Sequence, residues 1–174
     1  MKVPIHIKLL FILHLMTTAF FVYPQQAKAV MFSWFKKYGV HLSPAVYGKI
    51  TLDGKPLHSI KVFRELDYDK PYTDEAVTNA LGEFHFPEKN IKSRQPGNKL
   101  DQSTIRQVIS LDYHGQTFVL WYTSTPSIKP HATFQRLLSA LHCDLKAPEK
   151  KYSLPNIEYP NFPHAVVSIC RWPD

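Results

Sequence analysis

Short runs of β-branched and aromatic residues, separated by glycine, proline, asparagine and aspartate, dominate the chain from Leu42 onward. This pattern is typical of an all-β domain. The first run, Val46 to Leu52, ends at Asp53-Gly54. That dipeptide suits a tight hairpin because glycine accepts a positive φ at little cost. We expect Ser59 to Leu66 to return as the second strand of this hairpin.

Two further hairpins are predicted in the middle of the chain. Glu75 to Ala80 and Gly82 to Phe86 form one pair of runs, and the second run alternates apolar and polar residues. Such alternation gives one face to a core and the other to water. Ile105 to Tyr113 and Gln116 to Thr123 flank the turn dipeptide His114-Gly115, and both runs carry large apolar residues on both faces. We therefore expect them to be central strands.

The last predicted strands are Leu137 to Leu145 and Ala165 to Trp172, and a proline-rich segment separates them. That segment cannot hold a regular helix or a central strand. Within residues 131–141, apolar side chains also recur at helical spacing, so this stretch is either a helix or a helix that leads into a strand. The whole pattern predicts an antiparallel β-sandwich of about seven strands with one long ordered loop, in a single domain over residues 30–174.

Residues 1–29 have the pattern of a cleaved export signal. Lys2 and Lys8 accompany the apolar run Leu9 to Val22, and Ala27-Lys28-Ala29 supplies the small residues that signal peptidase requires. The apolar run is too short for a hydrocarbon core, which needs about 20 residues. We expect a periplasmic or secreted protein that begins near Val30 and is not inserted in a membrane.

A second start site leaves an alternative open. Met31, followed by an aromatic stretch that ends in Lys36-Lys37, would also begin a shorter cytoplasmic protein.

Two cysteines, Cys143 and Cys170, remain after the predicted signal is removed. An oxidising compartment favours a disulfide between them if their Cα atoms come within about 7 Å. Such a bridge would stabilise the fold by about 3–4 kcal/mol on the chain-entropy model. The alternative is a pair of separate buried thiols.

The charge of the chain gives little reason to expect a nucleic-acid partner. The formal net charge is +7, and the predicted signal accounts for three of the lysines. Lys89, Lys92, Arg94 and Lys99 gather in one segment, but that segment lacks the aromatic residues that stack on bases. We interpret it as a solvated loop.

Residues 46–86 carry a motif. Its parts are Val46-x-Gly48-x-Ile50, Gly54-x-Pro56-Leu57, Val62 and Thr78-x-x-x-Gly82-x-Phe84-x-Phe86. The motif resembles the carboxypeptidase regulatory-like and transthyretin-like β-sandwich modules, and the remainder of the chain is similar to a family of small bacterial proteins that carry this module.

The resemblance implies a fold more than an activity. It implies a β-sandwich in which Gly48 and Gly82 permit close backbone approach. Five residues are expected to face the core: Val46, Ile50, Val62, Phe84 and Phe86. Modules of this class are non-catalytic attachments to peptidases or parts of envelope proteins, and their family provides no activity to transfer residue by residue.

No catalytic motif occurs in the sequence. The His-Glu-x-x-His and Gly-x-Ser-x-Gly patterns and the glycine-rich phosphate loop are all missing. We expect no enzyme activity, no cofactor and no metal site, and we interpret the histidines after the predicted signal as exposed or capping residues. These are His41, His58, His85, His114, His131, His142 and His164.

Two segments have the mixed polar and aromatic character of protein-contact loops. One runs from Arg64 to Glu75 and joins two predicted strands, and the other is the proline-rich segment. Tyrosine and arginine are favoured at interfaces because they bury a large area and keep a polar group. The candidate partner-binding residues are Arg64, Asp67, Tyr68, Asp69, Tyr72, Tyr152, Tyr159 and Phe162.

The sequence therefore predicts a non-enzymatic exported domain that binds another protein. Its most specific form is a periplasmic immunity protein that neutralises a delivered toxin. The alternatives are a hydrolase, a cell-wall or carbohydrate-binding module that stacks Trp121, Tyr122 or Trp172 on sugar rings, and a structural subunit of an envelope assembly. We expect at least two of those three aromatic residues to pack in the core instead. The sequence does not fix the oligomeric state.

Overall fold

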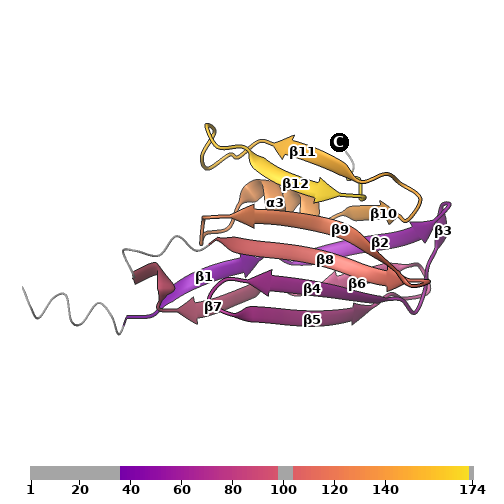
Figure 1. The fold of residues 1–174 in the computed structure, drawn as a ribbon, viewed down its shortest axis with the longest axis horizontal. Helices are drawn as coiled ribbons and strands as arrows, with labels where there is room; N and C mark the ends of the chain where they lie inside the picture. Colours follow the sequence, from indigo (N-terminus) through magenta and orange to yellow (C-terminus); the bar gives the residue numbers. More distant parts are fainter. Residues whose placement is uncertain (1–35, 98–103, 173–174) are drawn as a thin grey trace, which may run out of the picture.

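The larger of two packed β-sheets has six antiparallel strands (Figure 1). The computed structural model describes residues 36–97 and 104–172. The six strands are β4 (Lys61–Asp67), β5 (Pro71–Val77), β8 (Ile105–Tyr113), β9 (Gln116–Thr125), β11 (Lys150–Leu154) and β12 (His164–Ser168). Their order is β11-β12-β9-β8-β4-β5, so β5 and β11 form the two edges.

The second sheet is built around one strand, β2 (Val46–Leu52). Its partners are β3 (Lys55–Pro56) and β6 (Glu83–Phe86), both antiparallel, and β10 (Leu141–Asp144), which is parallel. The parallel pairing needs a crossover from the larger sheet. The short helix α3 (Ala132–Leu138) lies in that connection, directly before β10.

A two-stranded sheet completes the domain. It pairs β1 (Tyr38–Ser43) with β7 (Lys89–Ser93), which is followed by the 3-10 turn η1 (Gln95–Gly97). The expectation of a solvated basic loop here was wrong for Lys89 and Lys92, which lie in β7. Lys99 lies outside the described residues.

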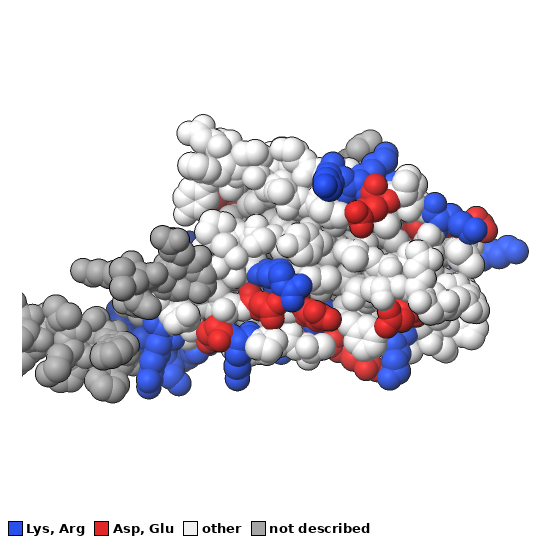
Figure 2. Space-filling view, viewed as in Figure 1, with Lys and Arg blue, Asp and Glu red and all other residues white. Residues whose placement is uncertain are grey.

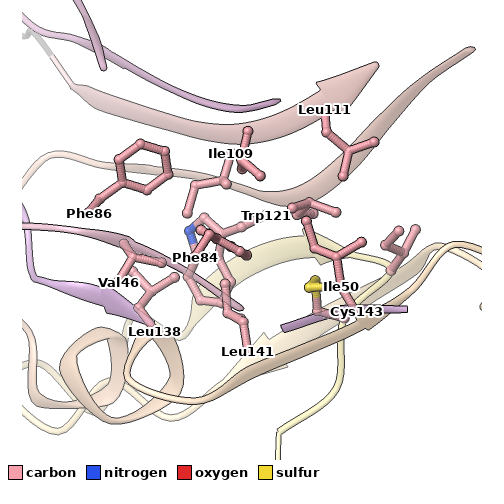
Figure 3. Close-up of a cluster of buried hydrophobic side chains, with 14 of the residues drawn as sticks. Val46, Ile50, Phe84, Phe86, Ile109, Leu111, Trp121, Leu138, Leu141 and Cys143 are labelled. Atoms are coloured by element: carbon pink, nitrogen blue, oxygen red, sulfur yellow. A yellow bond between two sulfur atoms is a disulfide. The ribbon is translucent and has the colours of Figure 1, made fainter. Parts of the chain in front are cut away.

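The two sheets and α3 enclose one core (Figure 3). Ile109 and Leu111 of β8 and Trp121 of β9 are fully buried, and they face side chains of β2, β6 and β10 across the sandwich. Trp121 meets Phe134 of α3 edge to face, with ring centroids 5.7 Å apart. An all-β sandwich was predicted from the sequence, and the structure confirms it.

The core residues implied by the motif are in place. Val46, Ile50, Val62, Phe84 and Phe86 are all buried. These side chains fill the interior between the two sheets.

The two glycines of the motif also have the expected role. A Cβ at Gly48 would lie 2.3 Å from the ring of Phe84, and one at Gly82 would lie 2.4 Å from the carbonyl oxygen of Ile50. Gly82 also has a φ of 75°. Gly48 is therefore needed for space, and Gly82 is needed for both space and backbone conformation.

Two predicted turns are confirmed. Asp53 and Gly54 have φ values of 51° and 74°, and they join β2 to β3. His114 and Gly115 have φ values of 51° and 77°, and they join β8 to β9 at the centre of the larger sheet. Positive φ at both central residues is the geometry that suits the twist of a two-residue hairpin.

Two predicted strand pairings were wrong. The run from Ser59 to Leu66 does not pair with β2; it becomes β4 and pairs with β5 and β8 in the other sheet. The run from Gly82 to Phe86 becomes β6 and pairs with β2, with Val46 opposite Phe86. Alternation along a strand identifies its buried face but not its neighbour, so the sequence pattern did not fix these partners.

The predicted segment from Arg64 to Glu75 is not a connecting loop. It contains most of the hairpin formed by β4 and β5, and only residues 68–70 form its turn.

The C-terminal part resolves the ambiguity at residues 131–141, which form α3 and then enter β10. As predicted, the described proline-rich segment holds no central strand: its strand β11 lies at the edge of the larger sheet and contains none of the prolines. The described residues contain twelve strands instead of about seven, because the sequence pattern did not reveal β1, β3, β7 and β11.

The predicted disulfide is present. Cys143 of β10 and Cys170, just after β12, are bonded, with their Cα atoms 4.0 Å apart. The bridge links the sheet built around β2 to the six-stranded sheet.

Among the described residues no helix has the length and apolarity needed to span a membrane. The predicted signal at residues 1–29 and the alternative start at Met31 lie outside the described residues.

Candidate functional site

The loop between β11 and β12, residues 155–163, projects from one end of the sandwich (Figure 1). It is held by its own hydrogen bonds. Asn156 Nδ2 donates to the carbonyl oxygen of Phe162 at 2.9 Å, and the Tyr159 amide donates to Asn156 Oδ1 at 3.0 Å. A further bond joins the Phe162 amide to the Tyr159 carbonyl at 2.9 Å. This β11–β12 loop is therefore ordered without a partner.

The β11–β12 loop presents apolar side chains to solvent. Ile157, Tyr159 and Phe162 are 66%, 50% and 73% exposed. From residue 152 to residue 170, Glu158 is the only aspartate, glutamate, lysine or arginine. Figure 2 shows the same contrast, since charged side chains are spread over the rest of this face and the projecting loop at its upper left is almost free of them.

A pocket of about 630 Å³ lies between this loop and the segment that follows β9. It is lined by residues 124–129, His131, Asn156, Tyr159 and residues 162–165. Its wall combines proline and aromatic side chains with a few hydroxyl and imidazole groups. Pockets of this kind accept an apolar group and fix its orientation through a few polar contacts.

Two histidines that line the pocket meet a carboxylate of the β11–β12 loop. His131 precedes α3, Glu158 belongs to the β11–β12 loop, and His164 is the first residue of β12. One donor atom from each of the three lies within 4.8 Å of the other two. The imidazole rings of His131 and His164 have centroids 4.5 Å apart.

Glu158 is held in place by the backbone as well as by the histidine. Its Oε1 accepts a hydrogen bond from the Ala132 amide at 2.8 Å, and its Oε2 lies 3.2 Å from His131 Nδ1. The Ala132 amide makes the largest contribution to a lowered pKa of Glu158, and His131 adds to it. Glu158 is therefore a carboxylate at neutral pH.

His164 lies in a different environment. Its side chain is 6% exposed, and its Nε2 has no hydrogen-bond partner among the described residues. Burial lowers the pKa of His164, His131 lowers it further, and Glu158 acts in the opposite direction. His164 is therefore a neutral imidazole with one unpaired nitrogen, and such a buried group costs about 1–3 kcal/mol.

One of the sequence-predicted contact residues is unavailable to any partner. Arg64 is fully buried, where its guanidinium bonds to Asp74 and to the carbonyl oxygen of Pro87. It also stacks over Phe86, with its Cζ 4.9 Å from the ring centroid. The prediction of a binding role for Arg64 was wrong, because an arginine in a mixed segment gives no sign that its strand faces inward.

The remaining candidates of the first segment lie near the turn between β4 and β5. Asp67 accepts a hydrogen bond from Arg106 Nε at 2.7 Å, and Asp69 accepts one from the Tyr72 hydroxyl at 2.9 Å. Tyr68 and Tyr72 pack against a small second core. This group belongs to the β5 edge of the larger sheet, whereas the β11–β12 loop belongs to the opposite edge. The structure does not bring the two groups together.

Within the second segment, two candidates are exposed and one is not. Tyr159 and Phe162 face solvent on the β11–β12 loop. Tyr152 is half-buried against Trp172, with ring centroids 4.9 Å apart, and its hydroxyl is buried. Its role is packing.

The aromatic residues that were considered for sugar stacking are mostly inside. Trp121 is fully buried, and Trp172 packs on it with ring centroids 6.1 Å apart. This confirms the expectation that at least two of the three serve the core. Tyr122 is 39% exposed.

Sequence reasoning missed Ile157 and the cluster of His131, Glu158 and His164. The expectation that all of the histidines are exposed or capping was wrong for His164, which is buried. His131 does occupy the N-cap position of α3, but its side chain is buried and makes no capping hydrogen bond. The cluster has no sequence signature, because His131 lies 27 residues before Glu158 and meets it only through the return of the chain to the sheet at β12. The available signal for Ile157 was its place between the prolines at residues 155 and 160, two residues before Tyr159.

The family comparison covers most of the sandwich. A family model described as a domain of unknown function, DUF6795, matches residues 46–148. The chain belongs to this family. The matched residues of this DUF6795 protein run from β2 through β10 and include His131, whereas Glu158, His164 and the β11–β12 loop follow them. No curated protein and no solved structure matches the chain. The resemblance to carboxypeptidase regulatory-like and transthyretin-like modules stays a prediction.

Proposed function

We propose that this DUF6795 protein is a non-enzymatic, exported protein-binding domain whose partner docks on the β11–β12 loop. The observation that carries the proposal is the exposure of Ile157, Tyr159 and Phe162 on a single ordered loop. Large apolar side chains that gather on one surface of a domain often mark a contact site. Loops held at the end of a rigid sandwich are a common position for binding residues.

The chemistry of the loop favours an apolar partner surface. Tyr159 and Phe162 also line the pocket, so a partner side chain that enters it would contact both rings. Aromatic side chains of this kind supply much of the binding energy at protein interfaces. Because the loop is already held by the hydrogen bonds of Asn156, little conformational entropy would be lost on binding.

Export is part of the proposal. The bond between Cys143 and Cys170 supports it, because disulfides persist in oxidising compartments. Removal of a signal at residues 1–29 would leave Val30 as the first residue. The intact mass of the protein recovered from the periplasm or the medium tests this assignment, and a protein that retains Met31 as its initiator would contradict it.

The specific form of this function is neutralisation of a toxin delivered to the periplasm. It rests on analogy with other small exported binders. Deletion of the gene should make cells sensitive to siblings that carry the neighbouring toxin genes. Unchanged survival in that competition would remove the immunity role and leave the binding role in place.

The binding role is tested by capture with matched variants. The full chain carries a C-terminal tag and is expressed in its own host, as wild type, as the double variant Tyr159→Ser/Phe162→Ser, and as Leu81→Ser. Leu81 is the control because it is 57% exposed but lies on the turn before β6. We expect one stoichiometric protein with the wild type and with the control, and its loss with the double variant. Equal capture by all three forms would contradict the proposal.

A further inference from the structure

The cluster of His131, Glu158 and His164 has the composition of a metal site. The three residues come from three separate parts of the fold, and one donor atom from each lies within 4.8 Å of the others. Two imidazoles with one carboxylate form a ligand set that suits zinc and its neighbours in the first transition row. Calcium and magnesium prefer sets made of oxygen alone.

One ligand position has no other explanation in the structure. His164 Nε2 is buried and has no hydrogen-bond partner among the residues that the structure describes. The residue is 6% exposed, and Nε2 itself is buried. Buried polar atoms are nearly always paired, and an unpaired one calls for a missing partner. A metal ion would provide that partner.

The other two ligands are oriented by contacts behind them. Glu158 Oε1 accepts a hydrogen bond from the Ala132 amide, which leaves Oε2 directed toward His131 Nδ1. The second ring nitrogen of His131 lies 3.4 Å from Thr125 Oγ1. Outer contacts of this kind fix the tautomer of a ligating histidine and the direction of a ligating carboxylate.

The site is accessible and needs only a small adjustment. Both histidines line the pocket, so an ion can enter from solvent and a water molecule can occupy a fourth position. Donor atoms around a tetrahedral zinc ion lie about 3.4 Å apart, given bonds of about 2.1 Å. Glu158 Oε2 and His131 Nδ1 already lie 3.2 Å apart, which is close to that separation.

We propose that His131, Glu158 and His164 form a binding site for a divalent transition-metal ion of the zinc class. This inference does not rest on the protein-binding role, because metal binding by the chain alone needs no partner docked on the β11–β12 loop. Either one can fail without the other.

The test uses the full chain with its disulfide intact and a purification tag that contains no histidine. The protein is stripped with a chelator, and Zn²⁺ binding is measured by calorimetry. Co²⁺ binding is followed through its visible d–d absorption, which reports the coordination geometry. We expect one ion per chain and a rise in the melting temperature. Absence of saturable binding by the wild type would overturn the proposal.

Three variants locate the ion. Glu158→Gln keeps the shape of an exposed residue and should fold normally, so it remains informative if His164→Asn does not fold. Both should weaken Zn²⁺ binding by at least about tenfold and change the Co²⁺ spectrum. The control is His114→Asn, at an exposed turn residue with a φ of 51°, a conformation that asparagine tolerates. Wild-type affinity in Glu158→Gln, or equal loss in the control, would place the ion elsewhere and overturn the proposal.

Discussion

Arg64 of β4 and Asp74 of β5 form an ion pair in the interior of the sheet edge, with Arg64 Nη2 2.6 Å from Asp74 Oδ2. The side chain of Arg64 is fully buried and that of Asp74 is 25% exposed. Lys89 of β7 adds a second cation, 3.0 Å from the other oxygen of Asp74. Asp74 therefore connects the larger sheet to the two-stranded sheet through Lys89. Its pair with Arg64 accounts for an arginine that sequence reasoning assigned to binding.

The first prediction concerns this pair. Asp74→Asn should lower the free energy of unfolding by about 3 kcal/mol, because it leaves the buried guanidinium without its counter-charge. Denaturation in urea at neutral pH measures the change. Asp69→Asn, at an exposed acid in the turn between β4 and β5, should change it by less than about 0.5 kcal/mol. Equal stability of wild type and Asp74→Asn would show that the pair is not needed.

Asp74 also gives the pair a pH dependence. Burial acts to raise the pKa of Asp74, but hydrogen bonds from Arg64 and Lys89 outweigh it and lower the pKa below 3.8. A carboxyl whose folded pKa is lowered contributes stability above its unfolded pKa and loses it as the pH falls through the folded value. Wild type should therefore lose more stability than Asp74→Asn when the pH falls below 3.8.

The second prediction concerns the disulfide. Cys143 and Cys170 are 27 residues apart, and the chain-entropy model gives about 3.5 kcal/mol for a loop of that length. A reductant should lower the free energy of unfolding by this amount. The double variant Cys143→Ser/Cys170→Ser should have the lower stability at the outset and should not respond to the reductant. A wild-type protein that unfolds identically in both conditions would contradict the estimate.

The third prediction concerns the contact between β2 and β6. Gly48→Ala should destabilise the fold by about 1–3 kcal/mol, because the added methyl group would lie 2.3 Å from the Phe84 ring. The smaller side chain in Phe84→Leu should reduce the cost of a second change at residue 48. A double-mutant cycle in urea measures this coupling, and strictly additive effects would show that the ring is not the obstacle.

Features that depend on neighbouring residues could be predicted from the sequence, and features that depend on long-range contacts could not. The turns at Asp53-Gly54 and His114-Gly115 were predictable because positive φ at two successive positions restricts residue type strongly. Burial of Phe84 and Phe86 followed from the alternation along their strand, and burial of Val46 and Ile50 was implied by the motif.

Strand partners and the candidate site were not predictable in the same way. The residues of β4 do not show whether its neighbour is β8 or β2, because either pairing buries the same face of the strand. Tyr159 and Phe162 were found through composition. His131 and His164 were missed because their proximity depends on how β12 returns beside β9.

The fourth prediction concerns the buried histidine in metal-free protein. Burial is the main cause of the lowered pKa of His164, with His131 acting in the same sense and Glu158 against it. Below pH 6.5, His164 therefore binds a proton more readily in the unfolded chain than in the folded chain. The free energy of unfolding decreases as the pH falls. The loss is complete once the pH has passed the folded pKa.

Urea denaturation at pH 7 and pH 5 with a chelator measures this dependence. His164→Phe should flatten it, because the variant has no proton to bind at that position. His114→Asn, at an exposed residue, should retain the wild-type slope. A wild-type slope in His164→Phe would assign the titration to another group.

The most direct test of the binding role is site-specific photo-crosslinking in living cells. A photoreactive amino acid is placed at residue 162, which is 73% exposed on the β11–β12 loop, or at residue 81, which is 57% exposed on the turn before β6. The account predicts a single crosslinked protein species from residue 162 and none from residue 81. No adduct at residue 162, or the same adducts from both positions, would contradict it.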